Sequence, residues 1–199
     1  MLVGRDVTEV AELCGAFLEG AVDRDWTAVV PGMDWTVAKT IAHACDCLLW
    51  YATDITAGSV ELSTWEAAVR PDSSPAELVR TLRAFASVLA AVVEATPEDA
   101  LGWHPWGLAD PAGFAGMGCD EMLVHTHDAA RGLGLEFAMP PEFARKVLTR
   151  MFPEAPTDRD PVRTLLWANG RIPLDDLPKR TGWRWHCAPL GSPALASGA

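Results

Sequence analysis

The 199-residue sequence lacks the features that mark several large classes of protein. It has no long hydrophobic run, because its longest nearly apolar stretch, residues 84–93, is about half of the roughly 20 residues needed to cross a bilayer. We therefore expect no transmembrane helix. It also has no excess of positive charge, since 16 Lys and Arg residues against 27 Asp and Glu residues leave a net charge of −11. A field of that sign repels phosphate backbones and anionic lipid headgroups, so neither nucleic acid nor a membrane is an expected partner.

Paired cysteine motifs are missing as well. The five cysteines are Cys14, Cys45, Cys47, Cys119 and Cys187. Their number is odd and no Cys-x-x-Cys occurs, so neither a disulfide framework nor a zinc ribbon is indicated. Charged residues between Arg5 and Glu12 interrupt the N-terminus where a secretory signal would be apolar, which favours a cytoplasmic location.

What is present fits one globular domain. The length suits a single domain, and 49% apolar residues with nine tryptophans supply enough bulk for a sizeable core. Residues 191–199 are small and rich in Ser, Ala and Gly. We therefore expect one domain over residues 1–190 and a flexible tail over 191–199.

Apolar residues recur at helical spacing in four stretches. They predict helices over about 7–26, 36–56, 74–95 and 119–132, with Thr8, Thr36 and Ser74 as starting residues. Shorter helices are expected at 141–151 and 161–168, a long loop at 96–117 and one short extended strand at 183–190. The expected fold class is all-α, a four-helix bundle with extra short C-terminal helices.

The segment from Asp120 to Asp128 concentrates side chains that can bind a metal. At about 100° per residue, Glu121, His125 and Asp128 fall on one helix face, within about 60° of each other, whereas His127 lies far round the helix. A Glu-x-x-x-His pair presents an oxygen and a nitrogen to one point, as a divalent cation in a helical bundle requires. The same spacing also occurs in solvated ion pairs, so both interpretations stay open.

His43 is the candidate ligand from a second helix. It lies among apolar residues such as Ile41 and Leu48, and a lone histidine there is commonly a core residue hydrogen-bonded to a neighbour. Facing Glu121 and His125, it would complete a set of two nitrogens and one carboxylate with positions left open. That is the ligand count of a catalytic zinc site.

Several segments resemble a known family. Trp35-Thr-Val-Ala-Lys-Thr-Ile-Ala-His43 resembles the W-x-hydrophobic-x-x-hydrophobic-x-x-H segment of DinB-like metal-dependent bundles, specifically the N-terminal domain of mycothiol-dependent maleylpyruvate isomerases. Glu121-Met-Leu-Val-His125-Thr-His-Asp128 is similar to that family's E-x-x-x-H-x-x-D helix. Residues 165–171 and 181–185 resemble the closing segments of single-domain relatives, so the resemblance covers roughly residues 7–186.

The resemblance implies a DinB-like four-helix bundle that holds a divalent metal, usually zinc, at the positions of His43, Glu121 and His125, with mycothiol as cosubstrate. The Asp128 match implies a polar residue beside the metal that orients a histidine or contacts the thiol; a helix-surface carboxylate is the alternative. The family's isomerases carry a second, C-terminal domain that contributes to the active site, and this chain ends too soon for a full one. The expected activity is therefore broader than that one isomerisation.

The favoured function is that of a metal-dependent mycothiol S-transferase or isomerase of mycothiol-using bacteria, a monomer or homodimer acting on a small electrophile. Trp103 and Trp106 are expected to line the mouth of the substrate pocket, with loop packing as the alternative. The pair His43-x-x-x-Cys47 is also similar to zinc-containing redox-sensing anti-sigma factors, although their Cys-x-x-Cys is missing. A non-catalytic bundle that binds a metal, a small hydrophobic ligand or a partner protein is the competing class.

Overall fold

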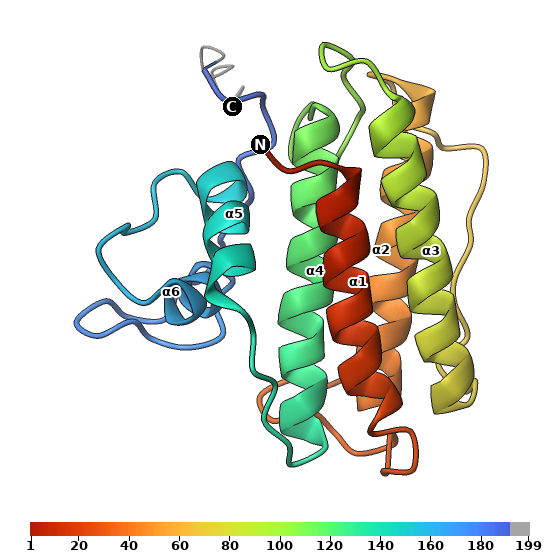
Figure 1. The fold of residues 1–199 in the computed structure, drawn as a ribbon, viewed down its shortest axis with the longest axis vertical. Helices are drawn as coiled ribbons and strands as arrows, with labels where there is room; N and C mark the ends of the chain where they lie inside the picture. Colours follow the sequence, from red (N-terminus) through yellow and green to blue (C-terminus); the bar gives the residue numbers. More distant parts are fainter. Residues whose placement is uncertain (192–199) are drawn as a thin grey trace.

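Four long helices stand side by side in a computed structural model that describes residues 1–191 (Figure 1). They are α1 (Gly4–Glu19), α2 (Val37–Ala57), α3 (Pro75–Ala95) and α4 (Pro111–Gly132). Two short helices follow beside them, α5 (Pro141–Met151) and α6 (Pro161–Ala168). No strand occurs among the described residues, so the predicted all-α bundle with short C-terminal helices is confirmed.

The helix α4 occupies the centre of the molecule. The helices α1 and α2 each pack against both α3 and α4, while α5 packs against α4 and α6. As a result 19 of the 22 residues of α4 are buried, from Phe114 and Met122 in the bundle core to the polar residues of its second half. Glu121 and His125 are among the buried residues, so a solvated ion pair between them does not occur.

Side-chain caps explain where most of these helices begin. Thr36 accepts a hydrogen bond from the Lys39 backbone N–H at 3.1 Å, and Ser74 and Glu77 cap each other's backbone N–H groups. Each cap satisfies an N–H group that has no partner within its own helix. Thr36 and Ser74 are thus confirmed as starting residues.

The first helix differs from its prediction at both ends. It begins at Gly4, so Thr8 lies inside it and its hydroxyl donates to the Gly4 carbonyl at 3.3 Å. The Asp6 carboxylate caps this end instead, because it accepts a hydrogen bond from the Val3 N–H at 2.9 Å. After Glu19 the chain turns, and Trp26 folds back to donate from Nε1 to the Ala21 carbonyl at 3.0 Å.

The predicted loop over 96–117 is also too long, because α4 begins at Pro111 with Asp110 as its N-cap. Glycines in the first turns of α4 suggested a loop, but they serve helix packing. A Cβ at Gly118 would lie 2.5 Å from Leu89 Cδ2, and one at Gly116 would lie 2.5 Å from Met151 Sδ. Close approach of neighbouring elements thus outweighs the low helix propensity of glycine.

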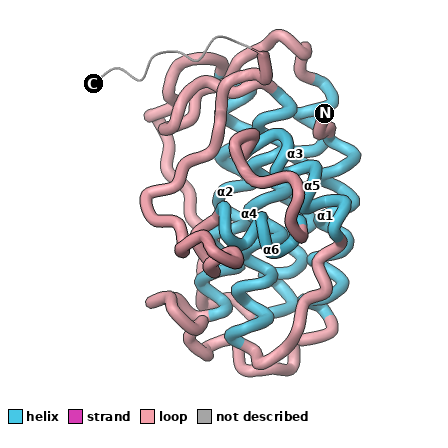
Figure 2. The backbone as a smooth tube through the Cα atoms, turned by 90° about the vertical axis from the view of Figure 1, so that its left-hand side faces the viewer, coloured by secondary structure: helices cyan, strands magenta, loops and turns pink. Residues whose placement is uncertain are grey.

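The strand predicted at 183–190 does not form. No other strand is available in the described residues to pair with it, and the described part of the chain consists of helices and loops (Figure 2). The His186 N–H donates to the Met151 carbonyl at 2.8 Å, and Arg150 donates to the carbonyl oxygens of His186 and Cys187, each at 2.9 Å. Backbone groups of this segment are therefore satisfied by α5 rather than by a sheet.

Two further predictions concern the limits of the domain. The single domain over residues 1–190 stays a prediction, and the flexible tail over 191–199 lies outside the described residues except for Gly191. Within the described part of the chain, no helix is both long and apolar enough to cross a bilayer.

Candidate metal centre and adjoining cavity

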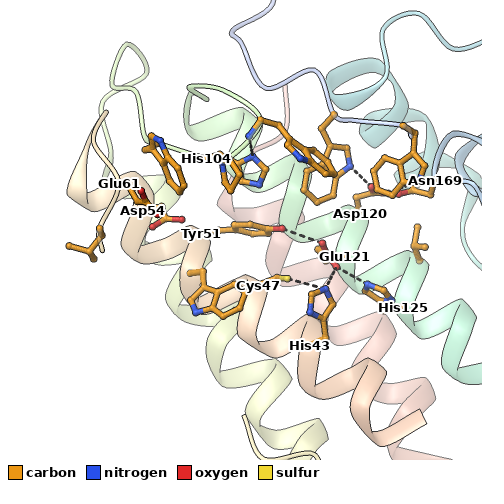
Figure 3. A pocket seen from close by; sticks show the side chains of 18 of the residues that line it. His43, Cys47, Tyr51, Asp54, Glu61, His104, Asp120, Glu121, His125 and Asn169 are labelled. Carbon is orange, nitrogen blue, oxygen red and sulfur yellow. Dashed lines mark hydrogen bonds and ion pairs between the residues drawn. The ribbon is translucent and has the colours of Figure 1, made fainter. Parts of the chain in front are cut away.

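His43 on α2 and the pair Glu121 and His125 on α4 converge at the interface of the two helices (Figure 3). One ligand atom from each residue lies within 4.8 Å of the other two. Glu121 Oε2 is 2.9 Å from His125 Nε2 and 4.0 Å from His43 Nε2. The structure thus brings together the three residues that the sequence predicts as ligands, whereas His127 lies outside the group.

Neighbouring side chains on α2 contact this group. The Tyr51 hydroxyl donates to Glu121 Oε1 at 3.2 Å, which leaves Oε2 directed at the two imidazoles. Cys47 Sγ lies 3.5 Å from His43 Nε2, and burial raises the pKa of its thiol well above the usual value. Cys47 is not part of the candidate ligand group, which does not favour the resemblance to anti-sigma factors.

Charged neighbours counteract the effect of burial on the pKa values of Glu121 and His125. Burial disfavours an ionised Glu121, yet its pKa falls below the usual value because His125 and His43 lie beside the carboxylate. Burial likewise disfavours a charged His125, but the negative charge of Glu121 and a contact with Asp128 raise its pKa to about 9. The arrangement therefore favours a negative carboxylate next to a positive centre.

The donor atoms fit a divalent metal. Glu121 Oε2 is buried and accepts no hydrogen bond, although both imidazoles approach it. A buried carboxylate oxygen that accepts no hydrogen bond costs free energy that a cation would recover. Two imidazole nitrogens and one carboxylate oxygen, with positions left open, form a donor set that could hold a divalent ion.

A cavity of about 640 Å³ opens beside this group. Its lining includes His43, Glu121 and His125 together with Tyr51 and His104, whose pKa burial lowers to about 4. Most of the tryptophans of the chain line it too, and they are Trp35, Trp50, Trp65, Trp103, Trp106, Trp183 and Trp185. Trp103 and Trp106 therefore lie where substrate contact was predicted, and that role stays a prediction.

Comparison with known proteins identifies the family. The model described as the mycothiol maleylpyruvate isomerase N-terminal domain matches residues 7–130. The chain belongs to this family. The match covers more than half of the chain, from α1 to nearly the end of α4, and confirms the resemblance seen in the sequence motifs. No curated protein and no solved structure matches the chain.

Asp128 lies within the residues that the family model matches, and it contacts the His125 ring. Its Oδ2 atom lies 3.3 Å from His125 Nδ1 and 2.8 Å from Arg171 Nη2. Burial would raise the pKa of Asp128, but His125 and Arg171 overcome that effect and lower it to about 2. Because Asp128 is only 1% exposed, the alternative of a helix-surface carboxylate is wrong.

Sequence reasoning missed Arg171 and Asp120, which join the matched domain to the segment that follows it. Arg171 comes after α6, where no spacing relates it to Asp128, and it lines the cavity. Asp120 is buried and accepts hydrogen bonds from Trp185 Nε1 at 2.7 Å and Asn169 Nδ2 at 2.9 Å. Burial raises the pKa of Asp120 to about 7. These contacts hold Trp185 over the cavity, so residues beyond the matched domain complete its wall.

Proposed function

We propose that this protein is a metal-dependent thiol S-transferase or isomerase that uses mycothiol and a small electrophile. The main support is the position of Glu121 Oε2, which is buried and accepts no hydrogen bond. Together with His43 and His125 it lies in the wall of an aromatic cavity. When bound there, a divalent metal, for which zinc is the best match, would lower the pKa of an incoming thiol so that it reacts as a thiolate at neutral pH.

The residues of the chain position the reactants. Tyr51 fixes the Glu121 carboxylate and Asp128 fixes the His125 ring, so the donor atoms are held before any ligand arrives. The tryptophan-lined cavity next to them would exclude water and hold the apolar part of an electrophile within reach.

Atoms and charge balance in each of the proposed reactions. In a displacement on a haloarene, the S–C bond forms as the carbon–halogen bond breaks, and the halide leaves together with the proton that the thiol lost. In an addition, the S–C bond forms as the π bond of an activated alkene breaks, and the neighbouring carbon takes up the proton that the thiol lost. Rotation about the new single bond followed by the reverse elimination returns the thiol and gives the isomerised alkene. The two activities therefore require the same site and differ only in the electrophile.

Metal content tests the site. The purified protein should hold about one divalent ion per chain, and His43→Ala and His125→Ala should each lose most of it. Glu121→Gln should weaken binding because it removes a negative charge, with the fold kept. His127→Ala is the matched control, since His127 lies on α4 outside the ligand group. An empty site in His127→Ala together with a full site in His125→Ala would contradict the assignment.

Turnover tests the activity. Wild-type protein with bound metal, mixed with mycothiol and a maleyl compound or a haloarene, should form an adduct or an isomer, and His125→Ala should not. If a fully metal-loaded protein gives no thiol-dependent product across a broad panel of thiols and electrophiles, the non-catalytic metal-binding bundle is the correct class.

A further inference from the structure

The cavity has two chemically different ends (Figure 3). His43, Cys47, Tyr51 and Asp54 follow one another along α2 at steps of four, four and three residues, so they share one helix face. All four line the cavity. At 1.5 Å per residue, Asp54 lies about 16 Å along the helix axis from His43. The end away from the candidate metal ligands therefore begins at Asp54.

Carboxylates without counter-ions gather at this far end. Asp54, Glu61 and Glu66 all line the cavity. None of the three belongs to an ion pair formed within residues 1–191. Burial, reinforced by the charge of Glu61, raises the pKa of Asp54 to about 6. The carboxylates of Asp54 and Glu61 thus repel each other in a partly desolvated space. A cation between them would relieve that repulsion.

Tryptophans surround the same end. Trp50 precedes Asp54 by one helical turn, and Trp65 belongs to the loop that carries Glu61. The Trp103 backbone N–H donates to the Gly58 carbonyl at 2.8 Å, which ties Trp103 to the C-terminal end of α2. Indole faces attract cations, and they do so more strongly when water is excluded.

A buried carboxylate oxygen also points to a ligand in this cavity. Glu121 opens on it with a side chain that is only 10% exposed and an Oε2 atom without a hydrogen bond. The acidic end and the Glu121 carboxylate are joined by the continuous face of α2 that carries Cys47 and Tyr51. One elongated ligand, or a thiol and an electrophile placed end to end, can therefore occupy both ends.

We propose that the electrophile for this site is an organic cation, an ammonium group on an elongated apolar or aromatic body. Asp54 and Glu61 hold the ammonium group among Trp50, Trp65 and Trp103, and the uncharged reactive end points toward the candidate metal ligands. A dicarboxylate of similar shape should bind less tightly than the cation, since the same carboxylates would repel it. The reactivity of the other end rests on the proposed function, whereas the charge preference of the cavity does not.

Calorimetric titration with three ligands of one shape tests the charge preference: 4-phenylbenzylammonium, 4-phenylbenzyl alcohol and 4-phenylbenzoate. We expect the ammonium compound to bind the wild-type protein at least tenfold more tightly than the alcohol, and the carboxylate to bind most weakly. In the double variant Asp54→Asn/Glu61→Gln, the ammonium preference should fall to about twofold or less while the alcohol binds as before. Glu98→Gln is the matched control, because Glu98 is exposed and does not line the cavity.

Equal binding of the three ligands to the wild-type protein would overturn the proposal, and so would an ammonium preference that survives in the double variant. Unchanged alcohol affinity shows that the variant is folded. The same titrations on His125→Ala separate this proposal from the proposed function, because they require neither metal nor turnover. Thiol-dependent turnover without any charge preference would leave the proposed function standing and remove only the assignment of the electrophile.

Discussion

Replacing Asp128 with asparagine tests how the chain prepares His125 for a metal. If His125 Nε2 binds a metal together with Glu121, the proton that stays on the ring resides on Nδ1, which lies 3.3 Å from Asp128 Oδ2. With its pKa lowered to about 2, Asp128 is charged throughout the neutral range. Asparagine keeps the shape of the side chain but removes the charge that orients the imidazole and increases its basicity.

Loss of such a supporting carboxylate lowers metal affinity by about 10–100-fold, which corresponds to about 1.4–2.7 kcal/mol. Arg171 also loses its ion pair, and it retains a hydrogen bond to the Asn169 carbonyl at 2.9 Å. We therefore expect a fall in unfolding free energy of about 1.5–3 kcal/mol, which still leaves a folded protein.

The assay is competition for the metal between the protein and a chromophoric chelator, with circular dichroism to verify that each variant is folded. Arg171→Met separates the two roles, because it removes the ion pair but keeps the Asp128 carboxylate beside His125; its metal affinity should stay closer to that of the wild type. A folded Asp128→Asn variant that binds metal as tightly as the wild type would refute this account of Asp128.

Three further predictions concern stability and reactivity. Arg150→Met should cost about 3–5 kcal/mol in chemical denaturation, because Arg150 is 2% exposed and its loss leaves Asp110 unpaired; Arg163→Met, at an exposed ion pair, should cost less than about 0.5 kcal/mol. All five cysteines are buried, and burial raises the pKa of Cys14 to about 12 and that of Cys47, which lines the cavity, well above its usual value. A thiol reagent at pH 8 should therefore label none of them rapidly before denaturation, and rapid labelling of one would contradict the packing. The pKa of Asp54 is raised from about 3.8 to about 6 in the folded protein, so its contribution to stability is full below pH 4 and is lost as the pH rises through 6. The melting temperature of Asp54→Asn should therefore rise relative to that of the wild type between pH 4 and 7. Parallel curves of melting temperature against pH would refute the shift.

Local sequence patterns determined most of the helices and the ligand spacing. The apolar periodicity after Ser74 and Pro75 predicted α3 at its observed bounds, because capping and helical repeat act within a few residues. The shared face of Glu121 and His125 follows from helix geometry alone, since side chains four residues apart must lie on the same side. His43 was a candidate because it lies among apolar residues and ends the segment from Trp35 that resembles the family motif.

Other features were decided by tertiary structure. Whether His43 faces Glu121 depends on how α2 and α4 pack, and the first turns of α4 are helical because Gly116 and Gly118 allow close neighbours. Arg171 meets Asp128 across 43 residues of sequence, and the acidic end of the cavity forms where a loop meets α2. No local pattern encodes such contacts, because their formation depends on the packing free energy of segments far apart in the chain.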